Sequence, residues 1–159
     1  METYEVTQKI LSFGPTYQVR RPGSDEVLVT VKGKLLSMTP QLNMVEGTEG
    51  REVASMKANF LKTKFVITGP NKEEVGTLAF PLVALKKSFV LTLGRREFKA
   101  DGGILAGKFT ANGASGPVLE IAKELSLKDK FRVNVAEEIP REVALLAAVA
   151  IDQKFFEES

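Results

Sequence analysis

The sequence predicts a mainly β protein in which a closed antiparallel barrel surrounds a buried helix near the C-terminus. Short segments of strand length with alternating apolar residues fill most of the chain, and turn signals separate them. The segment VALLAAVAI at 143–151 has no polar side chain on any face, so a helix of this composition must be covered on every side. Closing the sheet into a barrel removes its edges and provides that cover.

Strand-like segments follow one another from the N-terminus to the predicted helix. In chain order they are TYEVTQKI, TYQVRR, EVLVTVKG, REVASMKA, TKFVITG, EVGTLAF, KSFVLTLG, REFKADGG, LAGKFTAN, PVLEIAKEL and KFRVNVAEE. Turn-forming residues separate them in GPT (14–16), RPGSDE (21–26), EGTEG (46–50), GPNKEE (69–74), LGRR (93–96), DGG (101–103) and NGASGP (112–117). No Pro/Ser-rich linker divides the chain, so residues 1–159 are expected to form one domain.

A recurring spacing of lysine and apolar residues indicates a repeated hairpin. In each copy a strand finishes near a lysine, a tight turn follows, and an apolar or aromatic residue of the next strand comes eight residues after the lysine. The pairs are Lys9 with Tyr17, Lys34 with Leu42, Lys57 with Phe65, and Lys123 with Phe131. The alternative explanation is coincidence between amphipathic strands. In either case we interpret the repeat as a feature of architecture and not of chemistry.

The predicted helix extends from about Pro140 to Phe156. Ala and Leu, which lead the scale of helix propensity, dominate its centre. Pro140 suits the first turn, and Glu142 and Lys154 lie near the ends where the helix dipole favours their charges. The apolar run would cover about 14 Å, well short of a bilayer core of ~30 Å, so we expect no transmembrane span. The rival arrangement is a two-layer α+β fold, which would leave one side of the helix wet, although the helix has no polar side before Asp152.

Composition narrows the classes of function. The chain has 159 residues, a formal net charge of +2 and a pI near 8.8, which is too mild for the clustered basic face of a nucleic-acid-binding protein. The absence of Cys and His excludes disulfides, thiolate nucleophiles, imidazole bases and ordinary zinc sites. No cofactor and no metal are expected. The N-terminal METYEVTQKI lacks a signal-peptide pattern, so we expect a cytoplasmic protein.

Three features raise the question of catalysis, and each favours a structural interpretation. GGILAGK (102–108) has the spacing of a phosphate-binding loop, but Phe109 stands where Ser or Thr should hold magnesium, and no helix follows. Asp152 follows the buried run and is expected to cap the barrel mouth by accepting hydrogen bonds from nearby backbone, because a buried acid needs partners. Acidic pairs at predicted turns or at the terminus are interpreted as solvated charge: Glu73–Glu74, Glu137–Glu138 and Glu157–Glu158.

Basic residues are the main functional candidates. One predicted hairpin carries five candidate phosphate- or lipid-binding residues: Lys86, Lys87, Arg95, Arg96 and Lys99. A second group comes from equivalent turns of two repeats: Lys62, Lys64, Lys128 and Lys130. Either group can meet phosphate or an anionic membrane surface. The competing interpretation is that these charges keep strand edges solvated and block aggregation.

The order of these elements resembles the tubby C-terminal-like superfamily, and within it the LURP-one-related and phospholipid scramblase-like branch. The resemblance covers nearly the whole chain and depends on KLLSMTPQLNMVEGTEGREVASMKANFLKTKFVI (34–67), FPLVALKKSFVL (80–91), ASGPVLEIAKELSLKDKFRVNV (114–135) and ALLAAVAIDQKFF (144–156). It implies a barrel of about twelve strands around a buried C-terminal helix. Tubby proteins bind phosphoinositides, and scramblase-like members act on or near membranes, but none of the tubby lipid-binding residues is matched individually here.

These observations predict a non-enzymatic binding or scaffold domain that acts at a membrane surface or on phosphoinositides. The expected partners are anionic phospholipid, at which the protein would be peripheral, or another protein, and no nucleic acid. One alternative is an enzyme with a carboxylate-based site. Another is a carrier with a small ligand inside the barrel, although the helix should already fill that space.

Overall fold

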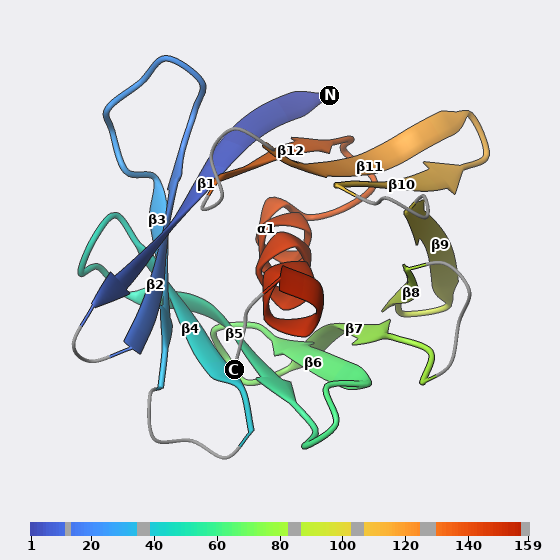
Figure 1. Cartoon of the computed structure of the whole chain (residues 1–159), viewed down its shortest axis with the longest axis horizontal. Coiled ribbons are helices and arrows are strands. Elements are labelled where there is room, and N and C mark those ends of the chain that lie inside the picture. Colours follow the sequence, from blue (N-terminus) through green and yellow to red (C-terminus); the bar gives the residue numbers. More distant parts are fainter. Residues whose placement is uncertain (12–13, 35–38, 83–86, 103–106, 125–129, 157–159) are drawn as a thin grey trace.

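The computed structural model describes residues 1–11, 14–34, 39–82, 87–102, 107–124 and 130–156. Within these ranges the chain forms twelve strands, one α-helix and a short π-helix (Figure 1). The strands are β1 (Glu2–Leu11), β2 (Gly14–Arg20), β3 (Val29–Gly33), β4 (Gln41–Glu46), β5 (Glu52–Ala58), β6 (Lys64–Thr68), β7 (Glu74–Ala79), β8 (Ser88–Leu93), β9 (Arg96–Gly102), β10 (Lys108–Gly113), β11 (Gly116–Lys123) and β12 (Lys130–Val135). The helices are α1 (Arg141–Ile151) and η1 (Asp152–Phe156).

The strands form one closed antiparallel barrel. Each strand pairs with the next in sequence, and β1 also pairs with β12, where Glu2 lies opposite Val135 and Thr7 opposite Lys130. Closure leaves no exposed sheet edge among the twelve described strands. The predicted barrel is therefore confirmed, and the rival two-layer fold is wrong.

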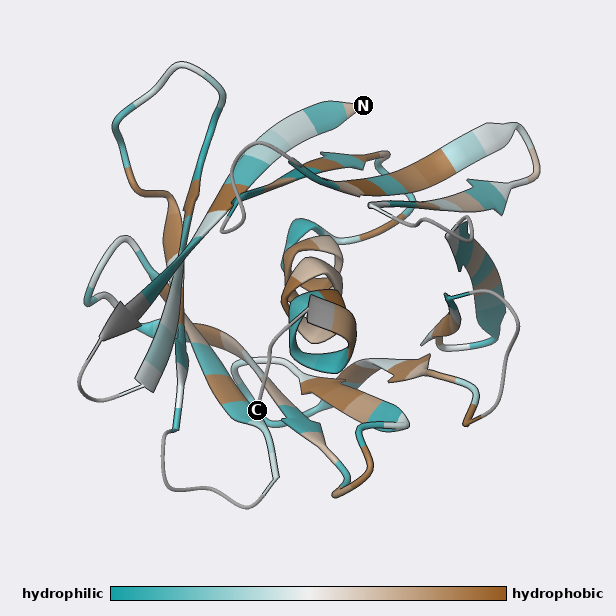
Figure 2. Cartoon of the chain, viewed as in Figure 1, coloured by the Kyte–Doolittle hydropathy of each residue, from teal (hydrophilic) through white to brown (hydrophobic). Residues whose placement is uncertain are grey.

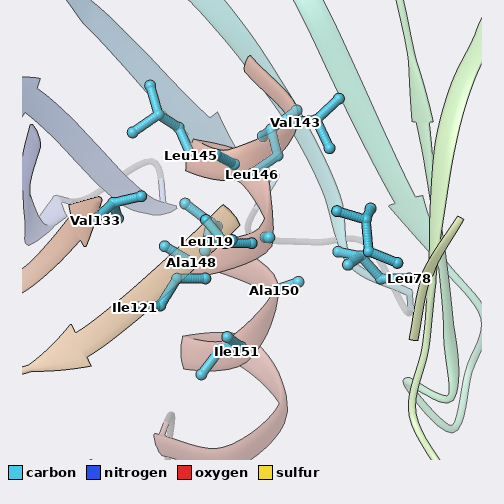
Figure 3. Close-up of a cluster of buried hydrophobic side chains, with 14 of the residues drawn as sticks. Leu78, Leu119, Ile121, Val133, Val143, Leu145, Leu146, Ala148, Ala150 and Ile151 are labelled. Atoms are coloured by element: carbon cyan, nitrogen blue, oxygen red, sulfur yellow. The ribbon is translucent and has the colours of Figure 1, made fainter. Parts of the chain in front are cut away.

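Helix α1 lies inside the barrel. Every residue from Val143 to Ile151 is buried, as the apolar composition of this run predicts. Figure 3 shows the helix between Val133, Leu119 and Ile121 on one side and Leu78 on the other. The buried side chains on the inward faces of the strands are mostly apolar, so the helix and the sheet together form a single hydrophobic core.

Both ends of the helix differ in detail from the prediction. Pro140 is the N-cap residue and not part of the first turn, although its carbonyl still accepts the first helical hydrogen bond, from the N–H of Ala144. The last five residues of the predicted segment, Asp152–Phe156, are π-helical. Wider π-helical turns are uncommon and are often associated with functional sites.

The repeated hairpin is confirmed, and it reveals a strand that propensity alone missed. The four copies correspond to β1–β2, β3–β4, β5–β6 and β11–β12, all of which pair antiparallel. β4 (QLNMVE) was absent from the predicted strands because Asn and Glu are disfavoured in strands. Leu42 and Met44 nevertheless alternate inward, and both are at most 2% exposed.

Alternating strand directions give the barrel two distinct mouths. The N-terminal mouth contains the beginnings of the odd-numbered strands, the ends of the even-numbered strands and the first residues of α1. The C-terminal mouth contains the ends of the odd-numbered strands, the beginnings of the even-numbered strands, and η1 (Figure 1). Residues far apart in sequence thus meet at one mouth. In the part of the chain that the structure describes, no helix has the length and apolar composition required to cross a membrane.

Candidate binding surface

A buried polar cluster lies where α1 ends at the C-terminal mouth. The Tyr17 hydroxyl on β2 donates a hydrogen bond to Asp152 Oδ2 at 2.7 Å. The same hydroxyl accepts hydrogen bonds from Gln153 Nε2 at 3.0 Å and from Gln8 Nε2 at 3.4 Å. Asp152 thus caps the mouth through a side chain on β2, and the expected bonds from nearby backbone to its carboxylate are not the ones observed. A hydroxyl 135 positions earlier in the sequence provides this partner.

Burial controls the electrostatics of this cluster. Asp152 is 1% exposed, and desolvation raises the pKa of its carboxyl group above the ordinary value of 3.8. The hydrogen bond from Tyr17 and the nearby charge of Lys123 act in the opposite direction. Lys123 Nζ lies 3.6 Å from Asp152 Oδ1 and 5.1 Å from the centre of the Phe131 ring. The cluster is therefore a paired, enclosed group that fastens η1 to β2 and β11.

An aromatic cluster holds η1 from the other side. The Phe155 ring stacks on Phe109 with centroids 5.7 Å apart and meets Phe80 edge-on at 5.5 Å. Phe80 in turn meets Phe65 and Phe89 at 5.5 and 5.6 Å. Since these rings come from β6, β8, β10 and the residue after β7, Phe155 anchors the end of the chain to several strands at once.

Two lysines fasten the turn between β5 and β6 to η1. Lys62 Nζ donates to the carbonyl oxygen of Gln153 at 3.0 Å, and Lys154 Nζ donates to the carbonyl oxygen of Leu61 at 3.3 Å. These reciprocal bonds join segments that are about ninety residues apart in sequence. The ammonium group of Lys62 thereby lies at the C-terminal end of the helical segment, where positive charge is favoured.

Lysines from every hairpin meet at the C-terminal mouth. The repeat seen in the sequence places Lys9, Lys34, Lys57 and Lys123 at the same end of four different hairpins. The β7–β8 and β9–β10 pairs contribute further lysines next to the starts of β8 and β10. We call this set the lysine ring, and its described members are Lys9, Lys34, Lys57, Lys62, Lys64, Lys87, Lys108, Lys123, Lys130 and Lys154.

Carboxylates neutralise only part of the lysine ring. Lys108 lies 3.5 Å from Glu120, Lys130 lies 3.2 Å from Glu5, and Lys123 pairs with Asp152 as described above. Glu124 is engaged by Arg132, and Asp101 on β9 adds an exposed carboxylate near this mouth. Among the described residues, Lys9, Lys34, Lys57 and Lys64 are exposed and form no ion pair.

The N-terminal mouth has the opposite character. Its cations are mostly arginines, and several are paired with carboxylates, as in Arg21–Glu2 at 3.0 Å and Arg51–Glu46 at 3.3 Å. The carboxylates there are Glu2, Asp25, Glu26, Glu46, Glu49, Glu52, Glu73, Glu74, Glu97, Glu137, Glu138 and Glu142. The cations are Arg20, Arg21, Arg51, Lys72, Arg95, Arg96 and Arg141. The barrel is therefore electrically polar along its axis, with the positive end at the C-terminal mouth.

The structure divides the basic hairpin predicted as a lipid-binding site. Lys87 belongs to the C-terminal mouth, where its Nζ lies 5.4 Å from the centre of the Phe155 ring. Arg95, in the turn after Gly94, and Arg96, the first residue of β9, lie at the N-terminal mouth, and Arg96 donates to the carbonyl oxygen of Glu138. Lys99 lies between the two ends, exposed on the outer face of β9. Lys86 is outside the described residues.

Other sequence features also have definite positions. The second predicted basic group falls in the lysine ring through Lys62, Lys64 and Lys130, whereas Lys128 is outside the described residues. Within the near-match to a phosphate-binding loop, Gly102 ends β9 and Lys108 begins β10, with residues 103–106 outside the described part. Lys108 is thus on a strand, as expected for a hairpin. Of the acidic pairs, Glu73–Glu74 and Glu137–Glu138 lie at the N-terminal mouth, and Glu157–Glu158 are outside the described residues.

Comparison with known proteins connects this architecture to a family. The sequence profile of the family described as LURP-one-related matches residues 2–152. This match includes all twelve strands, α1 and Asp152 at the start of η1. No curated protein matches the sequence.

Proposed function

Because the chain belongs to the LURP-one-related family and encloses its apolar helix in a closed barrel, we propose that it is a non-enzymatic binding domain for anionic phospholipid surfaces. The C-terminal mouth is the binding surface in this proposal. The protein would lie peripherally on the cytoplasmic face of a membrane, with the lysine ring towards the headgroups.

The observation that carries the proposal is the collection of unpaired lysines at one mouth. Lys57 lies opposite Val66 in the β5–β6 ladder, so Lys64 is its diagonal neighbour at about 7–8 Å. Lys34 bonds through its backbone to Gln41, which pairs with Lys57, so Lys34 and Lys57 are about 10 Å apart, or two strand spacings. A flat anionic surface can therefore meet all three ammonium groups together.

The expected strength is weak and reversible. Each basic residue near an anionic membrane contributes about 1 kcal/mol, so Lys34, Lys57 and Lys64 together contribute about 3 kcal/mol. Phosphoinositide headgroups, which the resemblance to tubby-like proteins implies as ligands, are more highly charged and would be bound more strongly by the same lysines.

The interior of the molecule supports a binding role in preference to the two alternatives. α1 occupies the barrel with side chains that are at most 1% exposed from Val143 to Ile151, so a ligand inside would have to displace the core. The buried carboxylate of Asp152 is engaged by Tyr17 and Lys123 and is 1% exposed, which suits a structural role better than contact with substrate.

Cosedimentation with neutral and anionic liposomes tests the proposal. Two double variants each remove two positive charges, Lys57→Ala/Lys64→Ala at the C-terminal mouth and Arg95→Ala/Arg96→Ala at the N-terminal mouth. We expect the wild type to sediment with anionic vesicles only. The lysine variant should lose about 2 kcal/mol of binding free energy, which corresponds to roughly thirtyfold weaker binding. The arginine variant should bind about as well as the wild type.

Salt provides a second criterion, because the Debye length falls from about 10 Å at 0.1 M to about 3 Å at 1 M. Binding by the wild type should therefore weaken as salt is raised. Equal binding to neutral and anionic vesicles, or no binding to either, would contradict the proposal. Weaker binding by the arginine variant alone would instead assign the site to the predicted hairpin at the other mouth.

A further inference from the structure

We infer that the turn between β5 and β6 inserts the side chains of Phe60 and Leu61 into the apolar layer of an anionic bilayer, with Leu82 of the neighbouring loop entering beside them. This inference rests on the proposed function, since it requires the C-terminal mouth to face the membrane. It adds a hydrophobic component to a contact that the lysine ring alone would make purely electrostatic.

Exposed large hydrophobic side chains gather at this mouth. Among the described residues, those with the highest exposure are Leu82 at 74%, Phe60 at 69%, Leu61 at 60% and Met1 at 60%. Single exposed apolar residues are ordinary on protein surfaces. Here, however, all except Met1 are on two adjacent connections at the C-terminal mouth, and a local apolar patch is characteristic of an interaction site.

Backbone hydrogen bonding places the two connections side by side. The N–H of Phe80 donates to the carbonyl oxygen of Thr63 at 2.8 Å, and Lys64 pairs with Ala79 where β6 and β7 meet. Figure 2 shows hydrophobic colouring both at the tip of the β5–β6 turn and just beyond the end of β7, separated by hydrophilic segments. The apolar side chains therefore project from neighbouring points of the rim.

The β5–β6 turn is held in a fixed shape. The N–H of Lys62 donates to the carbonyl oxygen of Asn59, which puts Phe60 and Leu61 at the two central positions of the turn. The Asn59 side chain accepts bonds from the N–H groups of Thr63 and Lys64 at 2.8 and 3.1 Å. Lys62 has a φ of +55° and is tied to Gln153. A tip ordered before binding loses little conformational entropy when it inserts.

The charges around the tip of the β5–β6 turn favour an anionic bilayer as its binding partner. Lys57, Lys62 and Lys64 lie within a few residues of Phe60 and Leu61, and none of them has a carboxylate partner among the described residues. Lysine stems can lie along an apolar surface while their ammonium groups stay in the polar layer. An apolar tip flanked by lysines matches the order of layers in a membrane, with acyl chains beneath negatively charged headgroups.

A single fluorophore tests insertion directly, because the sequence contains no Trp. The variant Phe60→Trp reports from the tip, and Thr48→Trp, in the exposed turn after β4 at the N-terminal mouth, is the matched control. Each is titrated with phosphatidylcholine/phosphatidylserine vesicles, with and without quencher groups on the acyl chains. We expect Trp at position 60 to shift its emission to the blue and to be quenched, and Trp at position 48 to do neither.

Affinity provides the second readout. Phe60→Ala/Leu61→Ala removes two large apolar side chains, and partial burial of both predicts at least tenfold weaker vesicle binding that retains its salt dependence. Lys57→Ala/Lys64→Ala should instead reduce the salt dependence. The apolar and electrostatic contributions to vesicle binding can therefore be measured separately.

The outcomes separate this inference from the proposed function. Binding to anionic vesicles without quenching of Trp at position 60 would overturn insertion and leave electrostatic binding intact. Absence of vesicle binding would overturn both. A blue shift that depends on protein concentration and needs no vesicles would also overturn insertion, because it would assign the tip to a second copy of the chain.

Discussion

At the scale of single residues, the carboxyl group of Asp152 links the stability of the C-terminal mouth to pH. Burial raises its pKa above the ordinary value of 3.8, so the folded chain binds this proton more tightly than the unfolded chain does. In the window from pH 3.8 up to the raised pKa, the folded state holds more protons. The contribution of Asp152 to the free energy of unfolding therefore falls as pH rises through that window.

Asp152→Asn should remove this contribution. We expect the stability of the variant relative to the wild type to improve as pH is raised from about 4 to neutrality, in denaturant titrations repeated across that range. Tyr17→Phe should act in the opposite direction, because it removes a hydrogen bond that lowers the pKa of Asp152. The free energy of unfolding of Tyr17→Phe should fall more steeply with pH than that of the wild type. Parallel pH profiles for all three proteins would contradict this interpretation.

The sequence predicts the burial of Asp152 but not the residues that contact it. It predicts that Asp152 is enclosed, because the residue follows an apolar run, and it predicts that a buried acid has partners. It could not identify Tyr17 or Lys123 as those partners, because both are brought to Asp152 by the order and register of the strands.

At the scale of elements, the fit of α1 inside the barrel determines whether the fold forms. Leu146 is fully buried at the centre of the helix. Leu146→Ala should lower the free energy of unfolding by about 2–5 kcal/mol, and Leu146→Asp by more, because it adds an unpaired buried charge. Chemical denaturation measures both.

Leu61→Asp is the matched control, since it makes the same change at a residue that is 60% exposed. The denaturation midpoint of Leu61→Asp should stay close to that of the wild type. A chain ending at Glu138, which lacks α1, should be insoluble or molten. Cooperative unfolding of that truncated chain at the wild-type temperature would show that the helix does not fill the core.

Elements with strong local patterns could be predicted, and those defined by context could not. The helix follows from its composition, and most strands follow from alternation. β4 escaped detection by propensity, although Lys34 and Leu42 fit the repeat, because two of its outward residues, Gln41 and Asn43, are polar and its flanking segment contains Pro40. The π-helical turn of η1 places Phe155 against Phe80 and Phe109, and no sequence pattern indicated this contact because the three rings come together only in the folded barrel.

At the scale of the whole molecule, antiparallel closure converts a sequence repeat into a polar surface. In the sequence, the lysines near the ends of the odd-numbered repeat strands are far apart and form no common surface. Once the strands alternate around a barrel, Lys9, Lys34, Lys57 and Lys123 all lie at the mouth where α1 ends. The length of β8 separates Lys87 from Arg95 and Arg96, which lie at opposite ends of the β8–β9 hairpin. Charge placement therefore depends on topology more than on proximity in sequence.

The most direct test of the C-terminal mouth as the membrane-facing surface is amide hydrogen exchange with and without phosphatidylcholine/phosphatidylserine vesicles. Vesicles should slow exchange at Phe60 and Leu61, in the turn of 59–63, because the bilayer covers that turn. Exchange at Thr48 and Glu49, and in the Gly94–Arg95 turn, should stay unchanged at the other mouth. Slowed exchange at 48–49 or 94–95 with none at 60–61 would contradict the assignment.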